Sequence, residues 1–288
     1  MKRYADLHIH TCLSDGSGTA AQALALARKN NVSYLSITDH NTMAAYTREA
    51  WEAADRLGLR LISGVELDTI FKGKQFHLLA FGAGTDNRRL IEACAHNARV
   101  QEDSNLSLLR RMEKDGLDVR EKEYEKYEIP PGRGGWKLLN YLFDAGMTKT
   151  LLEGLKYYGQ YGVDSDKIPF VDLDEAVRIV KEASGVPVLA HPAEQLPYNP
   201  YEADHTPFWS ALNELLETGM EGVECVHPLH SFGLQEELAA LCRERGLFIS
   251  GGTDYHGAFF SKQKQTIGGQ MVGADLVGRL IDSVAGKG

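Results

Sequence analysis

The sequence predicts an α/β protein in which strands and helices alternate around a barrel, with a helical segment inserted into it. Short apolar runs alternate with amphipathic stretches at both ends of the 288-residue chain. This rhythm is typical of βα units around a mostly parallel sheet. From about residue 86 to residue 170, in contrast, the chain is helical and polar, without an apolar run of strand length. We therefore expect a barrel from residues 1–90 and 171–288, and a helical cap subdomain at residues 91–170.

The first half of the expected barrel alternates strands with two helices. Thr19 is a suitable N-cap for a helix over residues 19–30. Gly58 suits the left-handed position that ends a second helix over residues 43–58. We expect the strands at residues 4–9, 32–38, 59–67 and 74–84.

The same rhythm returns after about residue 171. Amphipathic stretches predict helices at residues 172–185, 206–219 and 234–246, and apolar runs predict strands at residues 186–191, 221–226 and 247–254. The expected insertion is interrupted by the turn sequence IPPGRGG at residues 129–135.

Composition excludes several classes of protein. The formal net charge of −9 disfavours long nucleic acid as a partner, because a basic face supplies most of that affinity. The chain has no apolar run of about 18 residues that would span a membrane, and its N-terminus lacks the apolar region of a signal peptide. The four cysteines lack paired CxxC spacing. We expect a reduced, cytoplasmic protein that binds neither a membrane nor long nucleic acid.

Residues that can bind metal gather where the expected strands end. Because loops after parallel strands converge on one face of a βα fold, we expect these side chains to meet. His8 and His10 share one side of the first strand, since side chains alternate with a period of two. The other strand-associated residues are Asp39, His40, Glu66, His77, His191, Asp254 and His256.

The composition of this set indicates the metal. Imidazoles and carboxylates without cysteine suit Zn, Mn or Fe and argue against a structural thiolate zinc site. The set is too large for one tetrahedral ion, so we expect two or three divalent transition-metal ions as cofactors. Closely spaced ions clamp the attacking and leaving oxygens of a phosphoryl centre and lower the pKa of a bound water.

Five motifs, taken together and in order, resemble the PHP (polymerase and histidinol phosphatase) superfamily. They are ADLHIHTCLSDG, SITDHNT, SGVEL, VLAHP and GGTDYHG, which begin at residues 5, 36, 63, 188 and 251. Within this superfamily, the arrangement is similar to the branch of small metal-dependent phosphoesterases with a helical insertion. The resemblance implies a distorted (β/α)7 barrel with an inserted all-helical subdomain.

The resemblance also implies a ligand set, whose members would all be catalytic. It places His8, His10, Glu66 and Asp254 around one ion. Glu66 would bridge to a second ion, held by His77 and His191, and a third ion would be held by Asp15, His40 and His256. Each of these positions is occupied by a residue that can bind metal.

Three further residues are predicted to bind substrate. Arg133 lies in the Gly/Pro turn before a helix, and the resemblance places an arginine of the insertion over the metal site as a phosphate contact; the alternative is an exposed turn arginine. His227 and His230 follow a strand end and could contact substrate or protonate a leaving group. A position in a surface loop is the favoured alternative for both histidines.

Other residues near the motifs have two interpretations. Asp6 suits either the orientation of an imidazole or a loop cap, and Asp39 is expected to bond loop backbone. Trp136 and the tyrosines at positions 157, 158 and 161 either stack on a nucleobase or pack in a helical core, which we favour.

These observations predict a metal-dependent phosphoesterase. It would hydrolyse a phosphomonoester, or the terminal phosphodiester of a small nucleotide or short oligonucleotide in the manner of a 5′-exonuclease, by attack of a metal-bound hydroxide. One alternative is a histidinol-phosphate phosphatase, which the insertion disfavours. An amidohydrolase-type C–N hydrolase is another, but such enzymes usually bridge their ions with a lysine where this chain has Glu66. A non-catalytic metal-binding scaffold would show degenerate ligands, which are not seen.

Overall fold

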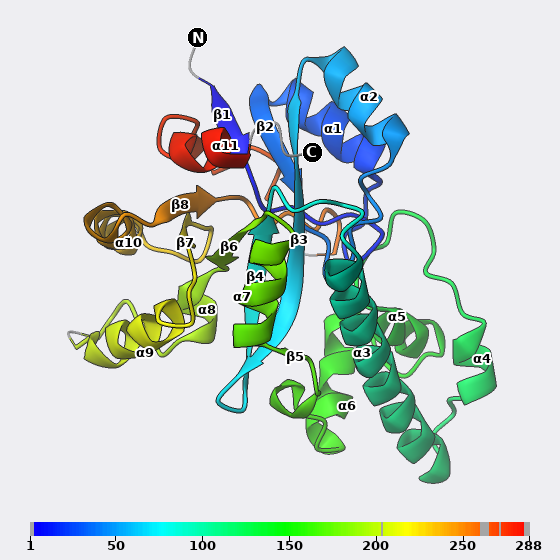
Figure 1. Cartoon of the computed structure of the whole chain (residues 1–288). Coiled ribbons are helices and arrows are strands. Elements are labelled where there is room, and N and C mark those ends of the chain that lie inside the picture. Colours follow the sequence, from blue (N-terminus) through cyan, green and yellow to red (C-terminus); the bar gives the residue numbers. More distant parts are fainter. Residues whose placement is uncertain (1–2, 203, 260–264, 271, 285–288) are drawn as a thin grey trace.

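The computed structural model describes residues 3–202, 204–259, 265–270 and 272–284 and shows an α/β barrel with helices on its outside (Figure 1). Residues 1–2, 203, 260–264, 271 and 285–288 of the expected barrel segments lie outside this description. The strands are β1 Tyr4–Asp6, β2 Val32–Ile37, β3 Arg60–Phe71, β4 Lys74–Phe81, β5 Val171–Asp172, β6 Val186–Leu189, β7 Gly222–Val226, β8 Phe248–Gly251 and β9 Val272–Gly273. They follow the order β8-β7-β6-β4-β3-β2-β1-β9 in the sheet, and β5 pairs with β3.

Backbone hydrogen bonds close the barrel between its first and last parallel strands. Beyond the ends of β1 and β8, the two segments of the polypeptide continue side by side. The amide of Leu7 donates to the carbonyl of Gly251 over 3.1 Å, and the amide of Asp254 donates to the carbonyl of His8 over 2.8 Å. The expected α/β barrel is confirmed, and closure brings the first and last ligand motifs together.

One connection differs from the expected βα rhythm. β3 and β4 form an antiparallel hairpin that turns at Lys72 and Gly73, whose φ angles are +50° and +75°, as a two-residue hairpin loop requires. β4 is also antiparallel to β6, so its first residues lie at the same end as the carboxyl ends of the parallel strands. The expected end of the third strand at residue 67 is wrong, because Asp68 and Thr69 continue it as buried polar residues whose bonds are satisfied inside the protein.

Helices cover the outside of the barrel. Thr19 caps α1 together with Gln22, and Gly58 ends α2 at φ +66°, as expected. α2 begins at Arg48, later than expected, and Thr47 caps it. The helices around the barrel are α1 Ala20–Lys29, α2 Arg48–Leu57, α7 Leu173–Glu182, α8 Pro192–Gln195, α9 Thr206–Leu216, α10 Phe232–Arg245 and α11 Gly278–Val284.

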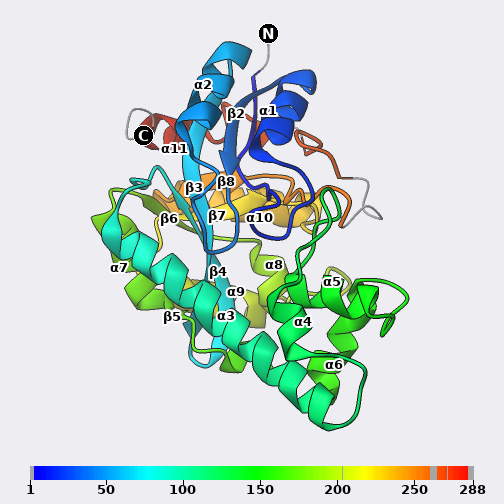
Figure 2. The same ribbon diagram turned by 90° about the vertical axis from the view of Figure 1, so that its right-hand side faces the viewer.

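A helical segment between β4 and β5 lies at one end of the barrel, away from α1 and α2 (Figures 1 and 2). It has a hydrophobic core of its own, which includes Leu108, Met112, Tyr124, Leu138 and Leu142. Tyr157 is buried in this core and the side chains of Tyr158 and Tyr161 pack against it, which favours the packing interpretation of these aromatic residues. Its elements are α3 Arg88–Lys114, α4 Glu121–Glu125, α5 Lys137–Asp144, η1 Leu152–Gly154, α6 Leu155–Gln160 and η2 Ser165–Lys167.

The long helix α3 joins the two parts of the molecule. Leu90, Ala93 and Cys94, in its first turns, belong to the barrel core, whereas Leu108 and Met112, near its end, belong to the core of the helical segment. The boundary expected between residues 90 and 91 therefore falls inside a continuous helix. Within the described ranges, no helix combines the length and apolar character needed to cross a membrane.

Candidate metal centre

Glu66 lies at the centre of a group of buried imidazoles. Its side chain, on β3, is 1% exposed, and each of its two oxygens faces a different set of ring nitrogens. Oε2 lies 3.2 Å from Nε2 of His8, 3.2 Å from Nε2 of His10 and 3.4 Å from Nε2 of His40. Oε1 lies 3.0 Å from Nδ1 of His77 and 3.0 Å from Nε2 of His191. A carboxylate with this division of neighbours is suited to bridging two ions.

Asp254 completes the group around His8 and His10. Its Oδ1 lies 3.3 Å from Nε2 of His8 and 3.1 Å from Nε2 of His10. The residue follows β8 and holds a left-handed φ of +50°, which costs a non-glycine residue energy and is common where function fixes the backbone. Barrel closure thus brings together the side chains from the beginning and end of the chain.

His77 reaches the site for a reason that the sequence did not predict. It is the fourth residue of β4, and because β4 is antiparallel, its start lies at the mouth of the barrel. Nδ1 of His77 lies 3.4 Å from Nε2 of His191, and both rings face the same oxygen of Glu66. The Nε2 atom of His77 lies 3.1 Å from Asp68, so the ring is held from both sides.

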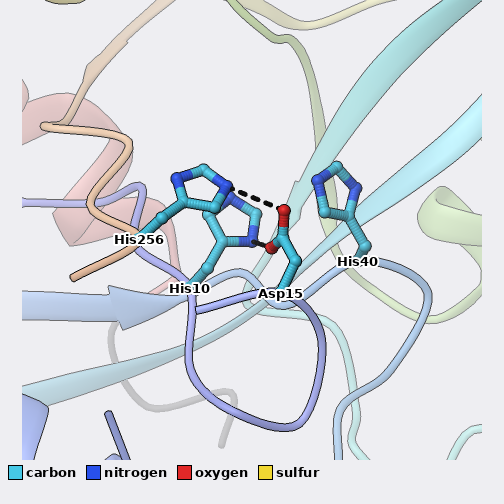
Figure 3. Close-up of side chains that lie close together, drawn as sticks. All are labelled: His10, Asp15, His40 and His256. Carbon is cyan, nitrogen blue, oxygen red and sulfur yellow. Dashed lines mark ion pairs between the residues drawn. The ribbon is translucent and has the colours of Figure 1, made fainter. Parts of the chain in front are cut away.

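A third group surrounds Asp15, which stands between His40 and the paired rings of His10 and His256 (Figure 3). Asp15 lies 3.2 Å from Nε2 of His256 and 3.6 Å from Nδ1 of His10. The rings of His10 and His256 stack at 4.1 Å. One potential ligand atom from each of these residues lies within 4.8 Å of the others.

The residues present fit divalent transition-metal ions. Burial raises the pKa of Glu66, but the surrounding imidazoles lower it more, so that its pKa lies well below the ordinary value and the carboxylate stays ionised. Burial lowers the pKa of His40 and favours the neutral imidazole that binds metal. Nδ1 of His40 is buried and has no hydrogen-bond partner among the described residues. Imidazole and carboxylate donors at such separations match the ligand preferences of Zn, Mn and Fe.

Sequence reasoning missed Glu224, which supports two of these histidines. The residue is fully buried on β7. Its Oε1 lies 2.9 Å from Nδ1 of His8, and its Oε2 accepts a hydrogen bond from the amide of His191 over 2.8 Å. Burial opposes ionisation, but His8 and its neighbours lower the pKa of Glu224 to about 2. The available signal was a carboxylate in the apolar run GVECV, because a buried charge requires a partner.

The carboxylates next to the ligand motifs bond loops. Asp39 accepts hydrogen bonds from the amide and the hydroxyl of Thr11, each over 2.7 Å, which confirms the expected role. Asp6 accepts from the amide and the hydroxyl of Thr253 and from the amide of Gly268. These bonds match the loop-cap interpretation of Asp6.

The surface alternative for His227 and His230 is wrong, because both side chains are buried. Nε2 of His227 lies 3.4 Å from Oδ2 of Asp254, at the edge of the site. Nδ1 of His230 lies 2.9 Å from the carbonyl oxygen of Cys225, with which it forms a hydrogen bond. The contact of either histidine with substrate stays a prediction.

Arg133 is engaged within the helical segment. Its Nη1 lies 2.7 Å from Oδ1 of Asp144, and its guanidinium lies over the ring of Phe143. The backbone after it reaches the metal site, because the amide of Gly135 donates to the carbonyl of Asp15 over 2.6 Å. The next residue, Trp136, places its ring 5.1 Å from that of His40. A phosphate contact by Arg133 stays a prediction.

A cavity of about 450 Å³ separates the ligand cluster from the helical segment. One wall consists of candidate ligands, including Glu66, His77 and His191. The opposite wall consists of residues of the helical segment, among them Gln101, Asn105, Trp136, Leu155 and Tyr158. A space of this size, with polar and aromatic walls, is in the range of small-ligand sites.

Comparisons with known proteins agree with this geometry. The PHP domain model matches residues 6–130. The phosphoribosyl 1,2-cyclic phosphate 1,2-diphosphodiesterase of Eggerthella lenta is 30% identical over 263 residues, which cover 88% of this chain and 94% of the relative. The 5′-3′ exoribonuclease Rnm of Escherichia coli is 24% identical, over 87% of this chain and 84% of the relative.

The solved structures include a similar fold. A protein from Bifidobacterium adolescentis, described as a metal-dependent phosphoesterase, superposes with a TM-score of 0.76 at 22% identity, over 98% of this chain and 96% of that one. Extensive similarity to the curated relatives, combined with the buried ligand cluster, identifies the family. The chain belongs to the PHP domain family, and it is a hydrolytic phosphoesterase.

Proposed function

We propose that this phosphoesterase hydrolyses a phosphomonoester, or the terminal phosphodiester of a small nucleotide or short oligonucleotide, with two or three Mn, Zn or Fe ions. The observation that carries the proposal is the cavity between the ligand cluster and the helical segment. Its volume suits a substrate of nucleotide size. Its position allows the phosphoryl group to lie against the ligands while the rest of the substrate lies against the helices.

Each part of the chain has a distinct role in this proposal. Divalent ions at the cluster would lower the pKa of water and neutralise charge on the phosphoryl oxygens. Glu66 holds the histidine groups on either side of it in register, because each oxygen faces a different group. Trp136 gives the cavity an aromatic wall against which a base or a sugar packs. The cap at residues 91–170 selects the leaving group.

A second candidate substrate is a cyclic phosphodiester of a phosphorylated sugar. The relative from Eggerthella lenta is named for a phosphoribosyl 1,2-cyclic phosphate and matches almost the full length of the chain. The same cavity accommodates a sugar of this kind. We further propose a cytoplasmic site of action, because the four cysteines are all free thiols, as is usual in a reducing compartment.

A substrate screen tests the proposal. Protein reconstituted with Mn, Zn or Fe is assayed against mononucleotides, sugar phosphates, cyclic phosphodiesters and short 5′-phosphorylated oligonucleotides. We expect release of phosphate or of a mononucleotide, and loss of this release in Glu66→Ala. Cleavage of cyclic amides, without hydrolysis of any phosphate ester, would contradict the proposal and support an amidohydrolase instead.

A further inference from the structure

We infer that Asn97 is a positioning residue that links the helical segment to the metal ligand His77 through Asn41 and Asp68. The inference rests on the metal site of the proposed function. Asn97, Asn41 and Asp68 are not themselves candidate metal ligands. They are joined to one another by a continuous set of buried hydrogen bonds.

The side chain of Asn97 connects α3 with two parts of the barrel. It is fully buried. Its Nδ2 donates to Oδ1 of Asn41 over 2.8 Å and to the carbonyl of Asp68 over 2.7 Å. Its Oδ1 accepts from the amide of Val171 on β5 over 3.0 Å. Because these bonds use both the donor and acceptor sides of the amide, an apolar residue would leave buried partners unsatisfied.

Asn41 lies in the loop after His40 and is hydrogen-bonded to two residues of β3, Glu66 and Asp68. Its φ is +52°, in the left-handed region that asparagine tolerates better than most residues. Its amide donates to the carbonyl of Glu66 over 2.8 Å. Its Nδ2 donates to Oδ2 of Asp68, and its Oδ1 accepts from the amide of Asp68. The position of Asn41 is thus tied to the strand that carries Glu66.

Asp68 passes this arrangement on to His77. Its Oδ1 accepts a hydrogen bond from Nε2 of Gln75 over 2.7 Å and lies 3.1 Å from Nε2 of His77. The amide nitrogen of Gln75 also faces Nε2 of His77, at the longer distance of 3.3 Å. A carboxylate at this nitrogen favours the tautomer with the proton on Nε2, which leaves the lone pair of Nδ1 directed toward Glu66 at 3.0 Å. Asp68 therefore selects the nitrogen of His77 that is free to bind metal.

The network makes the helical segment part of the metal site. Gln101 and Asn105 lie one and two turns after Asn97 on the same helix. Both line the wall of the cavity. The hydrogen bonds of Asn97 thus set the position of that wall and of a metal ligand together. Buried polar networks of this kind fix one arrangement only when every member is satisfied.

The test measures metal affinity by titrating metal-free, full-length protein with Mn. Loss of a hydrogen-bond partner of a metal ligand typically lowers affinity by about 10–100-fold, which we expect for Asp68→Asn. Asn97 is one hydrogen bond further from His77 than Asp68 is. For Asn97→Leu we therefore expect a loss of Mn affinity near the lower end of this range, about tenfold. Because both act through one path, Asn97→Leu should add little to the loss in the Asp68→Asn background.

Controls separate positioning from general damage to the fold. Asn105→Leu changes a buried asparagine of the same helix that bonds Tyr158 instead, and we expect Mn affinity within about twofold of the parent. Asn97→Asp keeps the acceptor for Val171 and removes the donors, so it should also weaken Mn binding if Asn97→Leu fails to fold. The inference would be overturned if a folded Asn97 variant bound Mn as tightly as the parent, or if the losses of Mn affinity were additive in the double variant. A parent that binds Mn without hydrolysing phosphate esters would overturn only the proposed function.

Discussion

The two ends of the ligand cluster are held in different ways. At the end that we call inner, because its carboxylates lie on strands, His8 follows β1 and lies between Glu66 on β3 and Glu224 on β7, with one ring nitrogen facing each. At the outer end, Asp15 and His256 lie in loops after the first and last parallel strands, and the helical segment contacts the outer loop through Gly135. The barrel thus fixes the inner ligands, whereas loops and the insertion fix the outer ones. We expect the inner end to bind metal more tightly.

The largest effect is expected from Glu66, which serves both sides of the cluster. Glu66→Ala should remove metal from both groups and lower activity by more than about a thousandfold, above the cost of losing one charge-stabilising group. His256→Ala should remove chiefly the outer ion and leave partial occupancy. Elemental analysis and kcat/KM of the two variants test this difference. Full metal content and activity in Glu66→Ala would show that it does not bridge.

Arg133 tests whether the insertion takes part in the chemistry. If its guanidinium leaves Asp144 to bind a phosphoryl oxygen, Arg133→Ala should lower kcat/KM by roughly one to three orders of magnitude, with metal content unchanged. Arg133→Lys should restore activity only partly, because an ammonium lacks the planar fork. Asp144→Asn frees the arginine and serves as the matched variant, which should retain activity. Equal stability losses in both variants, with kcat/KM within twofold of the parent, would identify an ordinary structural ion pair.

Glu224 gives the smallest expected effect and tests the inner end. Glu224→Gln keeps the shape but weakens the bond that orients His8, so metal affinity should fall by about 10–100-fold. Glu221→Gln is the control, since Glu221 lies just before the same strand in a half-exposed pair with Lys181 that contributes little. Both variants are titrated with Mn. Similar affinities would mean that the strand alone orients His8.

The gathering of candidate ligands after parallel strands was predictable from sequence, because side-chain alternation and the convergence of loops follow from the βα rhythm. His8, His10 and His191 belong to this class. His77 required knowledge of strand direction: only an antiparallel β4 brings its start to the mouth. Glu224 was hidden in an apolar strand, and its role depends on pairing with His8, more than 200 residues away in the chain.

The helical segment was less predictable than the barrel. Its helical character followed from composition, but its contacts with the site depend on three-dimensional packing. The bonds of Asn97 to Asn41 and of Gly135 to Asp15 join residues far apart in sequence, and no local pattern specifies them. The pairing of Arg133 with Asp144 is likewise a packing result, since a Gly/Pro turn alone leaves the direction of the guanidinium open.

Whether Glu66 bridges two ions is decided by the number of metal ions that the intact protein binds. Protein purified without chelator and then loaded with Mn or Zn should contain at least two equivalents of metal by elemental analysis, because Glu66 faces two separate histidine groups. During stepwise removal by chelator, we expect the outer ion to leave first and the inner ion last. A reproducible single equivalent, unchanged when Mn or Zn is added, would show that the cluster holds one ion and that Glu66 does not bridge.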